Sequence, residues 1–221
     1  MSISDKIKNF QNKFSKKIKL VAVSKTKSNE MILEAYNSGQ RDFGENKIQE
    51  LKKKHFELPK DILWHAIGHL QNNKIKFIAP FVYMIHSVDS LKILKKINQE
   101  AKKNNRSIFC LLQIFIAEEE NKFGLNLEEV KKLLNSEEFN NFKNVKICGL
   151  MGMATFSDND KLIRKEFRYL KYCFDEIKKS FFSKESYFKE ISIGMSGDYK
   201  IAMEEGSTIV RIGSSIFGNR N

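Results

Sequence analysis

The sequence is poor in the residues that mark secreted or disulfide-bonded proteins. Its 221 residues include only two prolines, one tryptophan and three cysteines. Cys110, Cys148 and Cys173 are odd in number and form neither a CxxC motif nor a cluster with histidine. This pattern predicts reduced, buried thiols in a cytoplasmic protein, and it argues against a disulfide framework or a zinc site.

Long apolar runs are also missing. Residues 1–8 are polar, and the apolar run at residues 20–23 is too short for the core of a signal peptide. No stretch approaches the roughly 20 apolar residues that cross a bilayer. Neither GxGxxG nor GxxxxGK[ST] occurs, so the common nucleotide-binding loops are not indicated. We therefore expect a cytoplasmic protein without membrane contact.

Positive charge is what the sequence has in excess. It holds 39 lysines and arginines against 27 acidic residues, for a formal net charge of +12. These cations are spread over predicted helices, such as residues 91–104 and 161–179, and acidic residues are interleaved with them. A solvated surface is the favoured interpretation. A nucleic-acid-binding module is the alternative, and it rests on the charge alone.

Short apolar runs alternate with amphipathic stretches along the chain. We predict eight strands at residues 18–24, 42–45, 63–67, 84–88, 107–115, 145–151, 190–194 and 208–212. We predict helices at residues 4–16, 30–38, 47–56, 73–79, 91–104, 127–135, 161–181 and 199–205. Alternating strands and helices form parallel sheets, and eight such units in about 200 residues fit a small (β/α)8 TIM barrel.

No linker or break in composition divides the chain, so we predict a single α/β domain over residues 1–221 with an extra N-terminal helix. A doubly wound open sheet is the alternative, but it usually has fewer strands and a glycine-rich first turn. Ser90 and Asp160 are candidate helix N-caps. Gly39 and Gly206 are placed where helices should end.

Lys25 ends the first predicted strand, where functional groups of such barrels gather. An amine partly withdrawn from water loses its proton more readily, which leaves a lone pair for a Schiff base with an aldehyde. The simple alternative is a lysine that ends a strand in solvent. Residues 194–197 and 213–215 follow the last two strands. They are either plain turns or a phosphate site in which Ser196 and Ser214 add hydroxyl donors.

Arg211 lies within an apolar strand, between Val210 and Ile212. A buried guanidinium needs a partner. A ring nitrogen that accepts a hydrogen bond would supply one, and so would an ion pair with Glu45 or Asp198. The sequence leaves both interpretations open.

His65 and His69 are four residues apart, but they straddle a predicted strand end and the following loop. No acidic residue or cysteine is spaced to complete a metal site with them. We interpret both as hydrogen-bonding walls of a pocket. Met195, after the seventh strand, is interpreted as packing material of the same wall. Asp89 and Asp198 fit helix caps.

Taken together, these segments resemble the pyridoxal-phosphate-binding protein family, also called the pyridoxal phosphate homeostasis proteins. The similarity spans nearly the whole chain in order. The matching motifs are AVSKT at residues 22–26, FGEN at 43–46, WHxIGHLQxNK at 64–74, HSVD at 86–89, KxG at 122–124, GLMGMA at 149–154, SxGMSxD at 192–198, VRIG at 210–213 and IFG at 216–218.

The resemblance implies a barrel like the N-terminal domain of alanine racemase, with pyridoxal 5′-phosphate (PLP) as the cofactor. It implies that Lys25 holds PLP as a Schiff base, that Arg211 faces the pyridine nitrogen and that Asn46 lies beside the ring. The phosphate would be held by Ser196, Gly213 and Ser214. Phe115 stands where the family usually has asparagine, which puts that part of the pocket wall in question.

Members of the family are regarded as carriers or regulators of PLP supply without an established reaction. The resemblance therefore implies a monomer that takes part in intracellular PLP homeostasis, with PLP-dependent apoenzymes as candidate partners. A racemase-like enzyme is the alternative, and it needs two bases, one on each face of the bound substrate. In alanine racemases the second base comes from a C-terminal β domain. The chain stops at Asn221, soon after the eighth predicted strand, so we expect no such domain.

Overall fold

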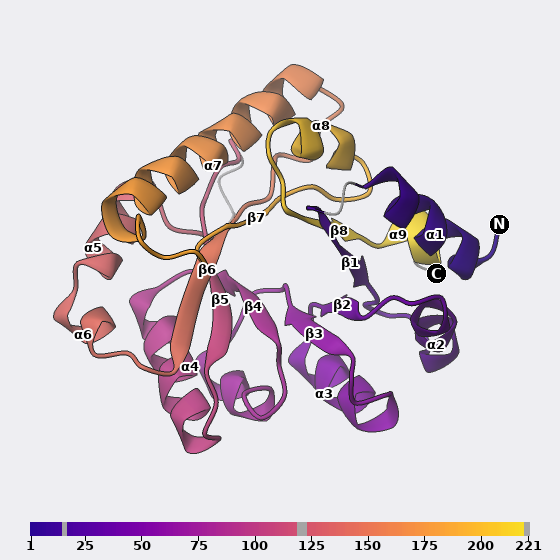
Figure 1. The fold of residues 1–221 in the computed structure, drawn as a ribbon, viewed down its shortest axis with the longest axis horizontal. Coiled ribbons are helices and arrows are strands. Elements are labelled where there is room, and N and C mark those ends of the chain that lie inside the picture. Colours follow the sequence, from indigo (N-terminus) through magenta and orange to yellow (C-terminus); the bar gives the residue numbers. More distant parts are fainter. Residues whose placement is uncertain (15–16, 119–122, 219–221) are drawn as a thin grey trace.

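The computed structural model describes residues 1–14, 17–118 and 123–218. Eight parallel strands form a closed barrel in the order of the sequence, and the last strand pairs with the first. Helices surround the strands on the outside (Figure 1). The structure thus confirms the predicted (β/α)8 TIM barrel, in which the carboxyl ends of all the strands meet at one mouth.

The strands are β1 (Lys19–Val23), β2 (Asp42–Glu45), β3 (Leu63–Ala66), β4 (Met84–Val88), β5 (Ile108–Gln113), β6 (Val145–Met151), β7 (Glu190–Ser192) and β8 (Ile209–Ile212). The helices are α1 (Ile3–Lys13), α2 (Asn29–Asn37), α3 (Ile48–Glu57), α4 (Leu91–Lys103), α5 (Leu127–Leu134), α6 (Glu137–Asn140), α7 (Asp160–Phe181), α8 (Tyr199–Glu204) and α9 (Ser214–Phe217). Each predicted strand overlaps an observed one. The predicted helix at residues 73–79 is a 3-10 helix, η1 (Asn72–Phe77), and the short helices α6 and α9 were not predicted. The predicted end of the first helix, at residue 16, lies outside the described residues.

Of the two predicted helix N-caps, Ser90 is confirmed and Asp160 is wrong. Ser90 caps α4, because its hydroxyl accepts a hydrogen bond from the backbone N–H of Ile93 at 3.3 Å. The cap of α7 is Asn159 and not the predicted Asp160, since the Asn159 side chain accepts from two N–H groups of the first turn. Asp160 is instead the first helical residue, where its negative charge favours the helix N-terminus.

Glycine is required at helix ends with a positive φ and where two strands approach closely. Gly39 and Gly206 follow α2 and α8 with φ angles of 99° and 92°, the left-handed region in which helices often end, as predicted. Gly149 lies in β6 directly opposite Glu190 of β7. A Cβ atom at position 149 would overlap the carbonyl oxygen of Glu190, so glycine sets the close spacing of these two strands.

The main apolar core lies between the barrel and its helices. The barrel interior differs, because among the described residues it buries the polar or charged side chains of His65, His86, Ser192 and Arg211. All three cysteines are buried and unpaired, as predicted. Within the described part of the chain, no helix is long and apolar enough to cross a membrane.

Candidate functional site

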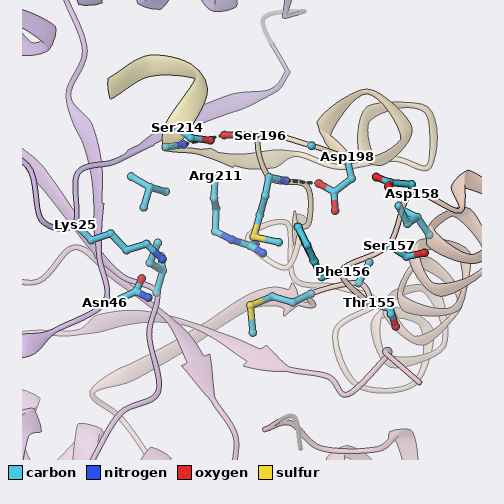
Figure 2. Close-up of a pocket in the computed structure, with 18 of the residues that line it drawn as sticks. Lys25, Asn46, Thr155, Phe156, Ser157, Asp158, Ser196, Asp198, Arg211 and Ser214 are labelled. Atoms are coloured by element: carbon cyan, nitrogen blue, oxygen red, sulfur yellow. Dashed lines mark hydrogen bonds between the residues drawn. The ribbon is translucent and has the colours of Figure 1, made fainter. Parts of the chain in front are cut away.

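A cavity of about 740 Å³ opens at the mouth formed by the carboxyl ends of the strands. Its walls come from residues that follow β1, β2, β3, β6, β7 and β8. Figure 2 shows the side chain of Lys25 close to that of Asn46, with Arg211 between them and the loop after β6. The cavity brings together most of the site residues expected from the sequence: Lys25, Asn46, Met195, Ser196, Arg211, Gly213 and Ser214.

His65 does not line this cavity, although we expected it in the wall. Side chains at positions two apart in a strand share a face, so His65 points into the barrel like Ile67 but one layer deeper. Ile67 reaches the cavity, whereas His65 is fully buried beneath it. Both ring nitrogens of His65 are engaged there, one with Asp42 at 2.9 Å and one with His86 at 2.8 Å.

His69 and Phe115 also lie away from the cavity lining. The Nδ1 atom of His69 is 3.2 Å from a carboxylate oxygen of Asp89, and its ring stacks on Phe123 with centroids 3.9 Å apart. Asp89 therefore pairs with a histidine, whereas the neighbouring serine supplies the cap of α4. Phe115 follows β5 and is half-buried outside the residues that line the cavity. The departure from the family pattern at Phe115 therefore leaves this wall unchanged.

Backbone contacts on both sides of Lys25 fix the place from which its side chain enters the cavity. Before it, the N–H of Ser24 donates to the carbonyl oxygen of Gly44 at 3.0 Å. After it, the N–H of Thr26 donates to Oε1 of Glu50 at 2.6 Å. Thr26 has a φ angle of 65°, which is uncommon for a β-branched residue and costs conformational energy. The surrounding contacts hold the chain in this conformation.

A buried ion pair lies directly behind the end of β1. The amine of Lys54 in α3 donates to Oε1 of Glu45 at 2.8 Å, to Oε1 of Glu50 at 2.6 Å and to the carbonyl oxygen of Ser24 at 2.8 Å. The Ser24 hydroxyl donates to the same Glu45 oxygen at 2.6 Å. Burial raises the pKa of Glu45, and the charge of Lys54 opposes this effect. The ion pair thus ties α3 and β2 to the residue that precedes Lys25.

Lys54 was not predicted from the sequence, although the sequence contains a signal for it. Ile48, Leu51 and Leu58 form an apolar stripe along α3, and Lys54 falls on that stripe. A lysine on the buried face of a helix requires an acidic partner. Glu45, in the strand just before α3, is that partner.

Arg211 is held from inside the barrel by neutral groups. Its Nη1 donates to the carbonyl oxygen of Ser192 at 2.7 Å and to the hydroxyl oxygen at 2.6 Å, and its Nη2 donates to the carbonyl oxygen of Gly152 at 3.0 Å. Glu45, one expected ion-pair partner, is engaged by a lysine of α3 instead. Burial lowers the pKa of Arg211 to about 10, and the charge of Asp198 opposes this shift. The guanidinium is therefore a cation at neutral pH, and it lines the cavity floor.

The loops after β7 and β8 lie next to each other, as predicted. The hydroxyl oxygen of Ser196 accepts long hydrogen bonds from the backbone N–H groups of Gly213, at 3.3 Å, and Ser215, at 3.4 Å. Both N–H groups thus meet at the Ser196 hydroxyl oxygen, and an anionic oxygen would suit the same two donors. Together with Lys25 and Arg211, they make a set of donors for a small anionic ligand.

The loop after β6 forms the wall opposite Lys25, which was not predicted from the sequence (Figure 2). Thr155 in this loop is held by Glu166 of α7, whose carboxylate accepts from the Thr155 N–H at 2.7 Å and from its hydroxyl at 2.6 Å. The same carboxylate accepts from the N–H of Glu118, after β5, at 3.1 Å. Glu166 is buried on the apolar face of α7, between Ile163 and Leu170. An acidic residue on the apolar face of a helix was the signal in the sequence that could have identified Glu166.

Replacing Glu166 by glutamine is expected to loosen both loops that this carboxylate holds. Hydrogen bonds to a charged group contribute about 1.5–3 kcal/mol, and an amide offers only one oxygen as acceptor. Hydrogen–deuterium exchange should become faster at the amides of Thr155 and Glu118. Asp175→Asn is the control, since Asp175 forms an exposed ion pair on the same helix. Equal exchange in the Glu166→Gln variant and the wild type would contradict the assigned role.

Comparison with known proteins places these residues in a family. The model of the alanine racemase N-terminal domain matches residues 2–221. A pyridoxal phosphate homeostasis protein from Aquifex aeolicus (strain VF5) is 39% identical over 203 residues, which cover 91% of this chain and 87% of that protein. A protein of the same name from Homo sapiens is 39% identical over 215 residues, covering 92% of this chain and 77% of that protein.

Solved structures show the same architecture. PipY from Synechococcus elongatus PCC7942, with PLP bound, aligns with a TM-score of 0.89 and 30% identity over 98% of this chain and 100% of its own. An alanine racemase from Clostridium difficile 630 aligns with a TM-score of 0.79 and 14% identity, over 99% of this chain and 60% of the racemase, and it shows a shared fold. The chain therefore belongs to the alanine racemase N-terminal domain family and, within it, to the pyridoxal phosphate homeostasis proteins.

Proposed function

We propose that the chain binds PLP in the cavity at the barrel mouth, joined to Lys25 as a Schiff base, and acts as a carrier or regulator in intracellular PLP homeostasis. The observation that carries this proposal is the convergence of Lys25, Asn46, Arg211 and Ser196 on one cavity. The structure of PipY with PLP supports it, since that relative is 30% identical over its whole length.

The residues present fit each part of PLP. The amine of Lys25 suits the aldehyde, with which it would form a carbon–nitrogen double bond as water leaves. The converging N–H groups of Gly213 and Ser215, with the hydroxyls of Ser196 and Ser214, suit the phosphate. The guanidinium of Arg211 suits a ring nitrogen that accepts a hydrogen bond.

Titration of the purified chain with PLP tests this proposal. We expect saturable binding at one site per chain, a visible absorbance band and retention of the cofactor after borohydride reduction. Inorganic phosphate should compete, because the phosphate donors contribute to affinity. Binding that fails to saturate would refute the proposed site.

An amino-acid racemase is the second candidate function, and the family fold favours it. Racemisation requires a second base across the bound substrate from Lys25. Among the described residues, neither tyrosine nor histidine lines the cavity. An arginine that donates to the ring nitrogen also leaves that nitrogen unprotonated, which weakens PLP as an electron sink. Both features support binding over turnover.

Assays of the PLP-loaded chain with alanine separate the two functions. We expect racemisation at the rate of free PLP alone, because neither tyrosine nor histidine is among the described residues that line the cavity. The control is an equal concentration of PLP without protein, and the readout is the ratio of the enantiomers. Saturable turnover above this background would favour the enzyme.

A monomeric state, a cytoplasmic location and transfer of PLP to apoenzymes are further parts of the proposal.

A further inference from the structure

A continuous row of polar groups crosses the barrel interior from one mouth to the other. Oδ1 of Asp42 lies 2.9 Å from Nε2 of His65, and Nδ1 of His65 lies 2.8 Å from Nε2 of His86. Nδ1 of His86 lies 2.9 Å from the hydroxyl of Ser192, which accepts from Nη1 of Arg211 at 2.6 Å. The five residues belong to five strands, β2, β3, β4, β7 and β8.

The two ends of the row fix where every hydrogen lies. The Asp42 carboxylate only accepts, so His65 must carry its hydrogen on Nε2. A neutral His65 then accepts at Nδ1, and His86 must donate from its own Nε2. A neutral His86 in turn accepts at Nδ1 from the hydroxyl of Ser192. Arg211 only donates, so Ser192 accepts from it, and every hydrogen bond points from Arg211 toward Asp42.

Both histidines are held in the neutral form that this order requires. Burial lowers the pKa of His65, although hydrogen bonding to Asp42 and the charge of Asp42 oppose this shift. Burial lowers the pKa of His86 well below its usual range, and the neighbouring His65 and Arg211 add to the effect. Protonation of His65 would place its Nδ1 donor opposite the Nε2 donor of His86. Protonation of His86 would make the Ser192 hydroxyl an acceptor from Nδ1, so either event would change the order of the row.

Charged and titratable groups at the ends complete the arrangement. The amine of Lys19 in β1 lies 4.0 Å from Oδ1 of Asp42, and the charge of Glu190 in β7 also acts on His65. The ring of Tyr83 packs edge-on against His65. At the other end, Asp198 acts on Arg211. A carboxylate and a guanidinium are thus joined through three neutral, buried groups.

We propose that Asp42, His65, His86 and Ser192 are positioning residues that hold Arg211, through this directed row of hydrogen bonds, in the orientation that meets the bound cofactor. The cofactor part of this inference rests on the proposed function. Asp42 is the first residue of β2, so it lies at the mouth opposite the cofactor cavity. It also lines a second cavity of about 280 Å³, with Lys19 and Arg41. A change at this far mouth is therefore transmitted to the cofactor site.

The first test needs neither a variant nor the cofactor. Nitrogen-15 NMR of histidine-labelled full-length protein distinguishes the two neutral tautomers and the imidazolium. We expect His65 and His86 to be neutral with the hydrogen on Nε2. His55 and His69 are the other two histidines, and single substitutions of them assign the signals. A hydrogen on Nδ1, or an imidazolium, at either buried position would overturn the proposed order.

The second test measures coupling to the cofactor. Asp42→Asn keeps the shape but removes the anionic end, and we expect PLP to dissociate roughly three to ten times more readily, the range of one hydrogen bond. Asp61→Asn is the matched control, because Asp61 is an exposed acid that pairs with Arg41 outside the row. Its affinity for PLP should equal that of the wild type.

A double substitution shows whether the effect passes through Arg211. In an Arg211→Met background, the further change Asp42→Asn should leave the PLP affinity unaltered within about twofold. The full effect of Asp42→Asn in that background would refute the positioning role. If the wild type fails to bind PLP at all, the proposed function fails, while the tautomers still decide the order of the hydrogen bonds.

Discussion

Replacing Lys25 by alanine is expected to abolish both the visible absorbance of the PLP-loaded protein and the covalent retention of PLP after borohydride reduction. Only an amine can form the carbon–nitrogen double bond with the aldehyde, and Lys25 enters the cavity beside Asn46 (Figure 2). The measurements are an absorbance spectrum and the mass of the reduced protein. Peptide mapping of the wild type should place the modification on Lys25.

Lys27→Ala is the matched control for this experiment. Lys27 lies two residues away and lines the same cavity, so it shares the local charge and the access of PLP. We expect this variant to keep the absorbance band and the covalent adduct. Loss of the band in Lys27→Ala with its retention in Lys25→Ala would move the attachment to the other lysine. Retention in both variants would refute attachment at either position.

Replacing Lys54 by methionine is expected to lower the free energy of unfolding by about 3–5 kcal/mol, the range for removing one partner of a buried ion pair. Methionine keeps much of the volume but leaves the carboxylate of Glu45 buried without its cation. The contact with the carbonyl oxygen of Ser24 is lost as well, so Lys25 should be less well placed. Urea unfolding measures the first effect, and PLP occupancy measures the second.

The stability deficit of Lys54→Met should shrink in acid. Burial already raises the pKa of Glu45 above its ordinary value of 4.5, and removing Lys54 raises it further. A group with a raised pKa in the folded state stabilises the fold at low pH and loses that contribution as pH rises through the folded pKa. The difference from the wild type should therefore be smaller near pH 5 than at pH 8.

Lys53→Met provides the control for these measurements. Lys53 is exposed on the same helix, one residue before Lys54. Its loss should change the free energy of unfolding by less than about 0.5 kcal/mol. An equal, small effect of both substitutions would show that the ion pair of Lys54 contributes little. A deficit independent of pH would show that Glu45 stays ionised.

Much of the fold follows from the sequence because its signals are local. Each strand run and each amphipathic period is readable within a short window, and the alternation of the two types predicts a parallel barrel. The short helices α6 and α9 are not readable in this way, since four residues hold hardly one helical period. The sequence did not distinguish Asn159 from Asp160 as the N-cap of α7, because both residue types are favoured at that position.

The candidate site was predictable where a residue lies in, or just after, the carboxyl end of a strand. Lys25, Asn46 and Ser196 do so, and the cavity includes them. His65 lies one layer deeper, and that depth depends on strand register around the closed barrel, which local patterns do not specify. Lys54 and its partner come from different elements, so their contact also required the assembled fold.

Gly149 has a consequence for how this protein can vary. It lies outside the cavity, but any side chain there would press on Glu190 and displace β7. Ser192, at the end of β7, holds Arg211. Substitutions at position 149 would therefore impair the binding site without contacting it, and selection would act against them. In a mutational scan for PLP retention, this glycine should be as intolerant as the residues that line the cavity.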